Sequence, residues 1–283
     1  MAASTERAGE EWQARRLRLE RHLQEIARPR HARWDRLGWL ACRHYLLDQL
    51  GALGPVERHR FVEGENLILR LPGRRPQAAP VLVGAHYDGP PGSCGADDNA
   101  SGVASLLELA RSWSRQPPRR PVWIVAFDQE ENGLLGSRAL AAELRRRRQP
   151  LQLMLSLEML GYTGAEQRYP LAAMRHLYGE RGDFIAVVAN LACLPLLPAM
   201  ARRIGRHLPV RLLPVPFAGK SLPDVRRSDH SPFWDHGYRA AMVTDTAFLR
   251  NPHYHRSSDT LDTLNLPFLH ACTDALEQAL GQL

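Results

Sequence analysis

Short apolar runs alternate with helix-forming segments over most of the chain, and this alternation constrains the fold more than any other feature of the sequence. Runs with the length and composition of β-strands lie at 66–71, 81–85, 122–127, 151–157, 184–189 and 240–243. Helical spacing of apolar residues occurs at 102–113, 137–147, 194–207 and 264–280. Strands that alternate with helices are typical of a mostly parallel sheet. We therefore predict an α/β fold with a twisted, mostly parallel mixed sheet and helices on both of its faces.

A single domain over residues 1–283 is the expected organisation. The length is close to that of two domains of about 150 residues each, but no linker or internal repeat divides the sequence. Residues 11–50 have helical spacing, and Pro29 should end the first of two helices near Ala27 because proline lacks a backbone donor. Residues 161–227 are rich in loops and prolines, and we expect them to leave the sheet and to shape a pocket.

Charge and cysteine content exclude several classes of protein. The 37 Lys and Arg residues against 30 Asp and Glu form no basic stripe interleaved with aromatic residues, so we expect no nucleic-acid partner. No apolar run reaches the roughly 20 residues that span a bilayer, and residues 1–30 lack the apolar region of a secretory signal, so we expect no membrane partner. The four cysteines are scattered, which favours a reducing, cytoplasmic location. The oligomeric state remains open.

Polar residues directly follow several of the predicted strands, where the ligand sites of open α/β sheets form. His86 and Asp88 lie two residues apart after the run 81–85, so their side chains share one side of an extended chain. Asp98 belongs to a stretch of small and acidic residues at 95–102 that leads into a helix. Each feature alone has an ordinary explanation, either a hydrogen-bonded histidine or an aspartate that caps a helix.

Three more carboxylates occupy equivalent places. Glu130 and Glu131 follow the run 122–127, and Glu158 ends the run 151–157. A solvated loop would explain the first two, and an ion pair with one of the many arginines would explain Glu158.

Histidines near the C-terminal side of the chain complete the set of candidates. His230 lies in the sequence Ser-Asp-His at 228–230, and His253 and His255 follow the turn signal Asn-Pro at 251–252. The residues alone do not decide which of these imidazoles binds a metal, and they assign no role to Lys220.

Taken together, these segments resemble the zinc-dependent exopeptidases of the M28 aminopeptidase family over residues 66–265, and the ordered set of motifs is highly specific. The resemblance implies the zinc exopeptidase fold, a peptide substrate and two Zn²⁺ ions. It also implies that Asp98 bridges both ions and that the metal ligands are His86, Asp98, Glu131, Glu158 and His255. This ligand set carries three negative charges against four positive ones, which leaves room for one hydroxide.

The same resemblance assigns the remaining roles. Glu130 is the general base, and Asp88 orients the ligand His86. The peptide bond between Asp98 and Asn99 is expected to be cis. Tyr254, next to His255, is the nearer candidate for a donor to the developing oxyanion, because the chain lacks the tyrosine that some aminopeptidases have before Ser-Asp-His.

Three alternatives to an aminopeptidase stay open. Glu158 stands where the family usually has aspartate, and related carboxypeptidases carry glutamate there. A glutaminyl-cyclase-like acyltransferase has this fold with a single zinc, and non-catalytic scaffolds of the same fold lose metal ligands. Two zinc equivalents, one or none would distinguish the hydrolase, the cyclase and the scaffold.

Overall fold

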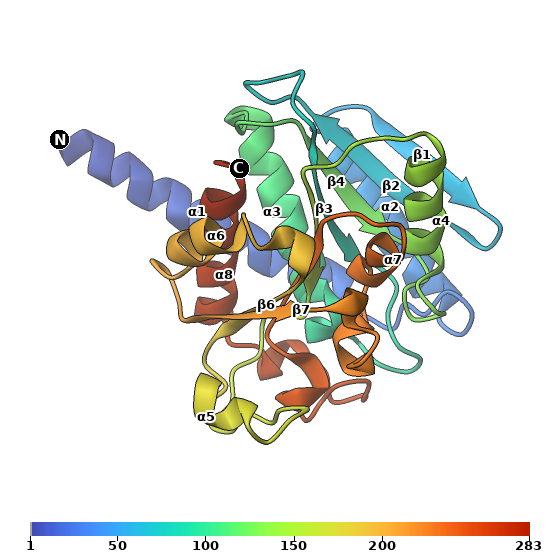
Figure 1. Ribbon diagram of the computed structural model, residues 1–283. Helices are drawn as coiled ribbons and strands as arrows, with labels where there is room; N and C mark the ends of the chain where they lie inside the picture. The colour runs from blue at the N-terminus through green and yellow to red at the C-terminus, as the bar shows by residue number, and fades with distance from the viewer. Residues whose placement is uncertain (1) are drawn as a thin grey trace.

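The computed structural model describes residues 2–283, with side chains from Gly9 onward, and places every strand in one eight-stranded twisted sheet (Figure 1). The strand order is β1-β2-β4-β3-β5-β8-β6-β7. The strands are β1 Val56–Phe61, β2 Gly64–Leu71, β3 Val81–His86, β4 Val122–Phe127, β5 Leu153–Glu158, β6 Ile185–Asn190, β7 Val210–Val215 and β8 Ala240–Thr244.

The middle of the sheet is parallel and the flanks are mixed. Strands β4, β3, β5 and β8 run parallel to one another, whereas β2 runs antiparallel to β4 and β6 runs antiparallel to β8. The four central strands are mostly apolar, since parallel strands are buried on both faces. The predicted mixed α/β sheet is confirmed.

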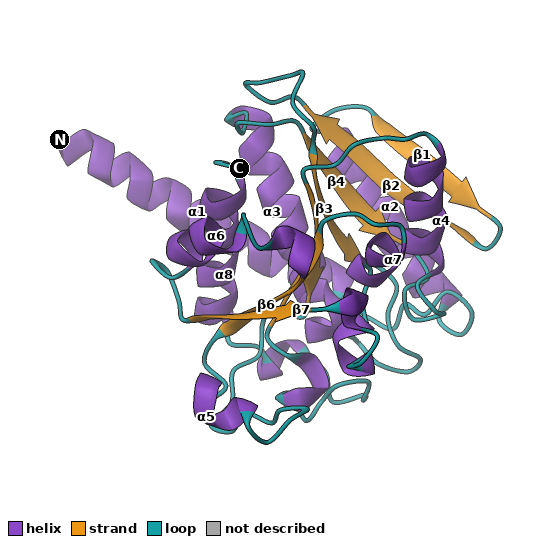
Figure 2. Cartoon of the chain, in the orientation of Figure 1, coloured by secondary structure: helices purple, strands orange, loops and turns teal. Residues whose placement is uncertain are grey.

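Helices cover both faces of this sheet (Figure 2). In β2, Leu67, Leu69 and Leu71 point into the larger core and Ile68 points into the smaller one, as the period of two requires. The larger core is closed by α1 Ala2–Ile26, α2 Arg36–Gly51, α3 Gly102–Arg115, α6 Leu197–Ile204 and α8 Leu266–Leu280. The smaller core is closed by α4 Leu135–Arg146 and α7 His230–Asp235, while α5 Met174–Tyr178 belongs to neither core.

The sequence analysis missed both edge strands. β1 reads Val-Glu-Arg-His-Arg-Phe, and β7 includes Arg211 and Pro214, so neither forms an apolar run. An edge strand pairs on one side only and tolerates charge and proline, which hides it from a search for apolar runs. The expectation that residues 161–227 leave the sheet was wrong in part, because β6 and β7 lie within them and join the sheet.

The N-terminal segment has the two helices expected. α1 ends at Ile26, one residue before the predicted end near Ala27, and the chain turns before α2. Of the helices in residues 2–283, none combines the length and the apolar composition that crossing a bilayer requires.

The parallel centre of the sheet determines where the polar candidates lie. β4, β3 and β5 are neighbours in the same direction, so the residues after each strand meet at one edge. His86 ends β3, Glu158 ends β5, and the loop with Glu130 and Glu131 follows β4.

Candidate metal centre

The first group of potential ligands combines His86, Asp98 and Glu158, all of them buried. His86 Nε2 lies 3.4 Å from Asp98 Oδ1 and 3.5 Å from Glu158 Oε2. Two ligands that each lie about 2.0–2.1 Å from a tetrahedral zinc ion are separated by about 3.3 Å. The spacing of these atoms therefore matches a shared cation.

The second group uses the other oxygen of the same aspartate. His255 Nε2 lies 3.2 Å from Asp98 Oδ2 and 3.4 Å from Glu131 Oε2. His255 is the most open of the candidates, with 38% of its side chain exposed. The two groups thus meet at Asp98, which presents one carboxylate oxygen to each of them.

Two buried polar atoms without a hydrogen-bond partner indicate whether a metal ion fits between these side chains. His86 Nε2 and Glu131 Oε1 are both buried and have no hydrogen-bond partner in the described part of the chain. Burial raises the pKa of Glu131 well above its ordinary value, and the carboxylate of Asp98 adds to this effect. Burial likewise raises the pKa of Glu158. Imidazole and carboxylate donors at this spacing suit Zn²⁺, whose charge offsets the crowded acids, so the residues fit the ion.

Glu130 lies beside this set without completing either group that shares Asp98. It forms a third cluster with His86 and Glu131. Burial raises the pKa of Glu130 well above its ordinary value, and the nearby carboxylates of Glu131 and Glu158 raise it further. Glu130 is therefore a half-buried carboxyl group beside the candidate ligands that belongs to neither of the two groups sharing Asp98.

Asp88 contacts His86 and also the loop that carries Glu130 and Glu131. His86 Nδ1 lies 3.2 Å from the backbone oxygen of Asp88 and 3.5 Å from its carboxylate, so the carbonyl is the nearer partner. The carboxylate instead accepts the backbone N–H groups of Glu130 and Glu131, each at 3.1 Å. Asp88 therefore holds the imidazole through its main chain and the Glu130–Glu131 loop through its side chain.

Asn99 joins two of the ligand-bearing segments, which the sequence analysis did not foresee. Its Nδ2 donates to Leu157 O at 2.8 Å, and its Oδ1 accepts the N–H of Met159 at 3.1 Å. These bonds fasten the Asp98 turn to the end of β5, next to Glu158. The peptide bond between Asp98 and Asn99 is cis, as predicted.

Two further supporting residues were also missed. Asp259 accepts the N–H groups of Asp97 and Asp98 at 2.9 and 3.1 Å, and Ser228 donates to Glu158 Oε2 at 2.7 Å. Ser228 occurs in the Ser-Asp-His motif that the sequence analysis quoted for its histidine, so its signal was present without an assigned contact.

The residues whose roles stayed open lie outside the metal groups. His230 is buried, burial lowers its pKa to about 3, and its Nε2–H donates to Val225 O at 2.8 Å. His253 Nδ1 lies 3.0 Å from Ser258 Oγ, and Lys220 is exposed. Among the described residues, the groups that could hold a metal include none of these three.

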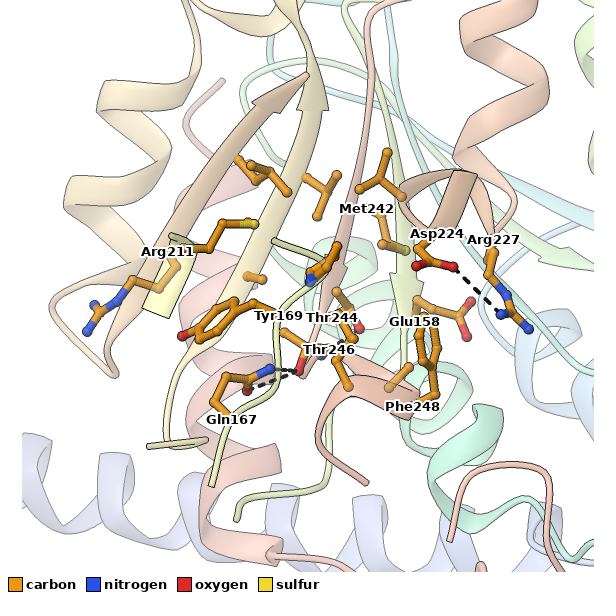
Figure 3. A pocket seen from close by; sticks show the side chains of 18 of the residues that line it. Glu158, Gln167, Tyr169, Arg211, Asp224, Arg227, Met242, Thr244, Thr246 and Phe248 are labelled. Carbon is orange, nitrogen blue, oxygen red and sulfur yellow. Dashed lines mark hydrogen bonds and ion pairs between the residues drawn. The ribbon is translucent and has the colours of Figure 1, made fainter. Parts of the chain in front are cut away.

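A mostly apolar pocket opens beside Glu158 (Figure 3). Met242 and Phe248 lie near Glu158 in this view, and Gln167 and Tyr169 lie at the far side. Further apolar residues of its wall are Met174, Phe184, Ala186, Val188 and Leu213. Residues 161–227 contribute much of this lining.

Tyr254 lines the same pocket and stacks on a predicted ligand. Its ring centroid lies 3.9 Å from that of His255. Neighbouring side chains of an extended segment diverge, but His255 has a φ of 57°, so the chain turns here and both rings lie together. Burial raises the pKa of Tyr254, which keeps its hydroxyl protonated and able to donate.

Sequence comparisons match this chain to known proteins. Residues 66–280 match the model of peptidase family M28. The uncharacterised protein YfbL of Escherichia coli K12 is 40% identical over 203 residues, which cover 65% of this chain and 61% of YfbL. Leucine aminopeptidase 1 of Arthroderma otae is 27% identical over 238 residues, which cover 77% of this chain and 57% of that protein. The chain thus spans about three fifths of the length of these relatives.

Solved structures share the fold. LapA of Legionella pneumophila superposes with a TM-score of 0.73 at 21% identity, over 96% of this chain and 75% of LapA. A glutaminyl cyclase of Bacteroides thetaiotaomicron superposes with a TM-score of 0.65 at 16% identity, over 96% and 98% of the two chains. The family model covers most of the described sheet and each predicted metal ligand, and the chain belongs to peptidase family M28.

Proposed function

We propose that this chain is a two-zinc aminopeptidase that removes N-terminal residues from peptides. The observation that carries the proposal is the pair of ligand groups that meet at the two oxygens of Asp98, with Glu130 alongside. The name of leucine aminopeptidase 1, a relative that covers 77% of this chain, supports the same activity.

The proposed ligands are His86, Asp98 and Glu158 for one ion and Asp98, Glu131 and His255 for the other. When bound, the two ions supply Lewis acidity and a water of lowered pKa. Glu130 accepts a proton from the attacking water and transfers it to the leaving amine. The carboxylate of Asp88 holds Glu130 in place by accepting the backbone N–H of Glu130. Tyr254 donates its hydroxyl hydrogen to the carbonyl oxygen of the scissile peptide bond as negative charge develops there.

The pocket beside Glu158 supports a preference for apolar N-terminal residues. Its wall is mostly apolar, and an apolar wall favours an apolar substrate side chain. The free cysteines, of which Cys42, Cys193 and Cys272 are buried, support a reducing location such as the cytoplasm.

The decisive experiment combines metal analysis with a substrate screen. We expect two zinc equivalents per chain after loading, and hydrolysis of amino-acid anilides and of peptides with a free N-terminus. N-blocked peptides should remain intact. Cleavage of N-blocked peptides from the C-terminus would identify a carboxypeptidase instead. One zinc equivalent with cyclisation of N-terminal glutamine would identify an acyltransferase, and absence of zinc binding would indicate a scaffold.

The pocket assignment has its own test in Ala186→Phe. Ala186 is 8% exposed and lines the pocket, so a phenyl group there should fill space that a large substrate side chain needs. We expect kcat/KM for leucine anilide to fall by about tenfold or more relative to that for alanine anilide. Ala165→Phe, at an exposed position, is the matched control. An equal decrease in kcat/KM for both substrates would show that the pocket does not select the substrate side chain.

A further inference from the structure

Arg30 is a fully buried arginine in the turn between α1 and α2, outside the residues that match the family model. Its Nε donates to Tyr87 O at 3.0 Å, and its Nη1 donates to Cys94 O at 2.6 Å. Its Nη2 donates to Gly95 O at 2.9 Å and to Asp98 O at 3.2 Å. Weaker bonds of 3.3 Å connect Nη1 to the carbonyls of Ile26 and Arg28.

These acceptors are all backbone carbonyls. Among the described side chains, no carboxylate oxygen lies within 4.0 Å of Arg30 as an ion-pair partner. A buried cation without a paired carboxylate is costly, and the carbonyl dipoles around the guanidinium offset that cost. Arg30 is therefore held by hydrogen bonds to backbone carbonyls and not by a salt bridge.

Four of the six carbonyls, those of Tyr87, Cys94, Gly95 and Asp98, belong to the two segments that carry His86 and Asp98. Tyr87 directly follows His86 at the end of β3, and Asp98 is the residue that the two groups share. One rigid, planar guanidinium thus spans the β3 loop and the turn before α3, with N–H groups in fixed directions. It connects the main chains at His86 and at Asp98, whose side chains lie 3.4 Å apart.

Two glycines of these loops lie against Arg30. A Cβ at Gly89 would lie 3.2 Å from Arg30 Cγ. A Cβ at Gly95 would collide first with the backbone oxygen of Asp98 and would lie 3.0 Å from Arg30 Nη1. Gly95 also has a φ of 54°, a conformation that side chains rarely adopt. The loops therefore pack closely against this side chain and against each other.

We propose that Arg30 is a positioning residue of the metal centre, through which the N-terminal helical segment sets the spacing of His86 and Asp98. The inference rests on the proposed two-zinc function. It goes beyond that function because it assigns part of the metal affinity to a residue outside the family match. Loss of the Arg30 hydrogen bonds should let the distance between the two ligand-bearing loops vary. Zinc affinity should therefore fall even where proton transfer is unaffected.

The test measures zinc affinity in Arg30→Lys and Arg30→Met by chelator competition, with Arg33→Met as the control because Arg33 is exposed. Loss of an outer partner typically lowers metal affinity by about 10–100-fold, and we expect this range for Arg30→Met. Arg30→Lys should be intermediate, since an ammonium has three donors in a different geometry. The visible spectrum of the cobalt-loaded protein should change in both Arg30 variants and remain unchanged in Arg33→Met.

The alternative is that Arg30 only stabilises the fold. In that case Arg30→Lys would lower the melting temperature of the apoprotein, with zinc affinity and cobalt spectrum as in the parent, and the proposal would be overturned. If Arg30→Met does not fold, Arg30→Lys decides alone, because it keeps the charge and most of the volume. A parent protein that binds no zinc would instead refute the proposed function, so the two failures are distinguishable.

Discussion

Glu130→Gln is expected to lower kcat by about 10²–10⁴ and to leave the zinc content at two equivalents, because the amide cannot accept a proton from water. Glu130 lies within the cluster of His86 and Glu131 but is absent from the two groups that share Asp98. Zinc content by elemental analysis and kcat on an amino-acid anilide are the two measurements.

Glu131→Gln provides the matched comparison at the neighbouring position. Glu131 Oε2 lies 3.4 Å from His255 Nε2 in the second ligand group, so this variant should lose zinc as well as activity. Glu166→Gln, at an exposed position, should change neither quantity. If Glu130→Gln loses a zinc equivalent while Glu131→Gln keeps both, the roles of the two glutamates must be exchanged.

Tyr254→Phe should lower kcat by about 10²–10³ with little change in KM, the usual cost of removing one donor to the developing oxyanion. The structure favours this role because the Tyr254 ring stacks on His255 and lines the pocket that Glu158 borders. A phenol of ordinary pKa is protonated at neutral pH, and burial raises the pKa of Tyr254 further.

Steady-state kinetics on one apolar anilide separate the two possible roles of Tyr254. A defect confined to KM would show that the ring only contacts the substrate side chain. Tyr169→Phe is the matched control, because Tyr169 lines the far side of the same pocket and its hydroxyl donates to Gly179 O. An unchanged kcat in Tyr254→Phe would leave oxyanion stabilisation to the zinc ions.

The central strands could be predicted from local sequence and the edge strands could not. β4 was predicted at 122–127 and spans Val122–Phe127, because a parallel strand buried on both faces must be apolar throughout. β1 and β7 pair on one side only, so their charged and proline residues carry little strand signal. Whether residues 161–227 join the sheet depended on β8 and β6 pairing antiparallel, a contact between distant segments.

The side chains of the candidate site were identified from their motifs, while their contacts were not. The pattern His-Tyr-Asp identified Asp88, but only the fold shows that its carboxylate accepts the N–H groups of Glu130 and Glu131. Asn99 and Asp259 had no predicted role, since their partners are far away in the sequence.

By itself, the sequence determined the chemistry that is local: which strands are buried, which residue types follow them, and which of those types bind a cation. Tertiary structure alone decided how these residues are held. The 3.2–3.5 Å spacing of the ligand atoms depends on three strands ending at one edge. It also depends on Arg30, 68 residues before Asp98, reaching its backbone carbonyl. Backbone carbonyls are the same in every residue, so a contact made to them leaves no trace in the sequence of the segment that is held.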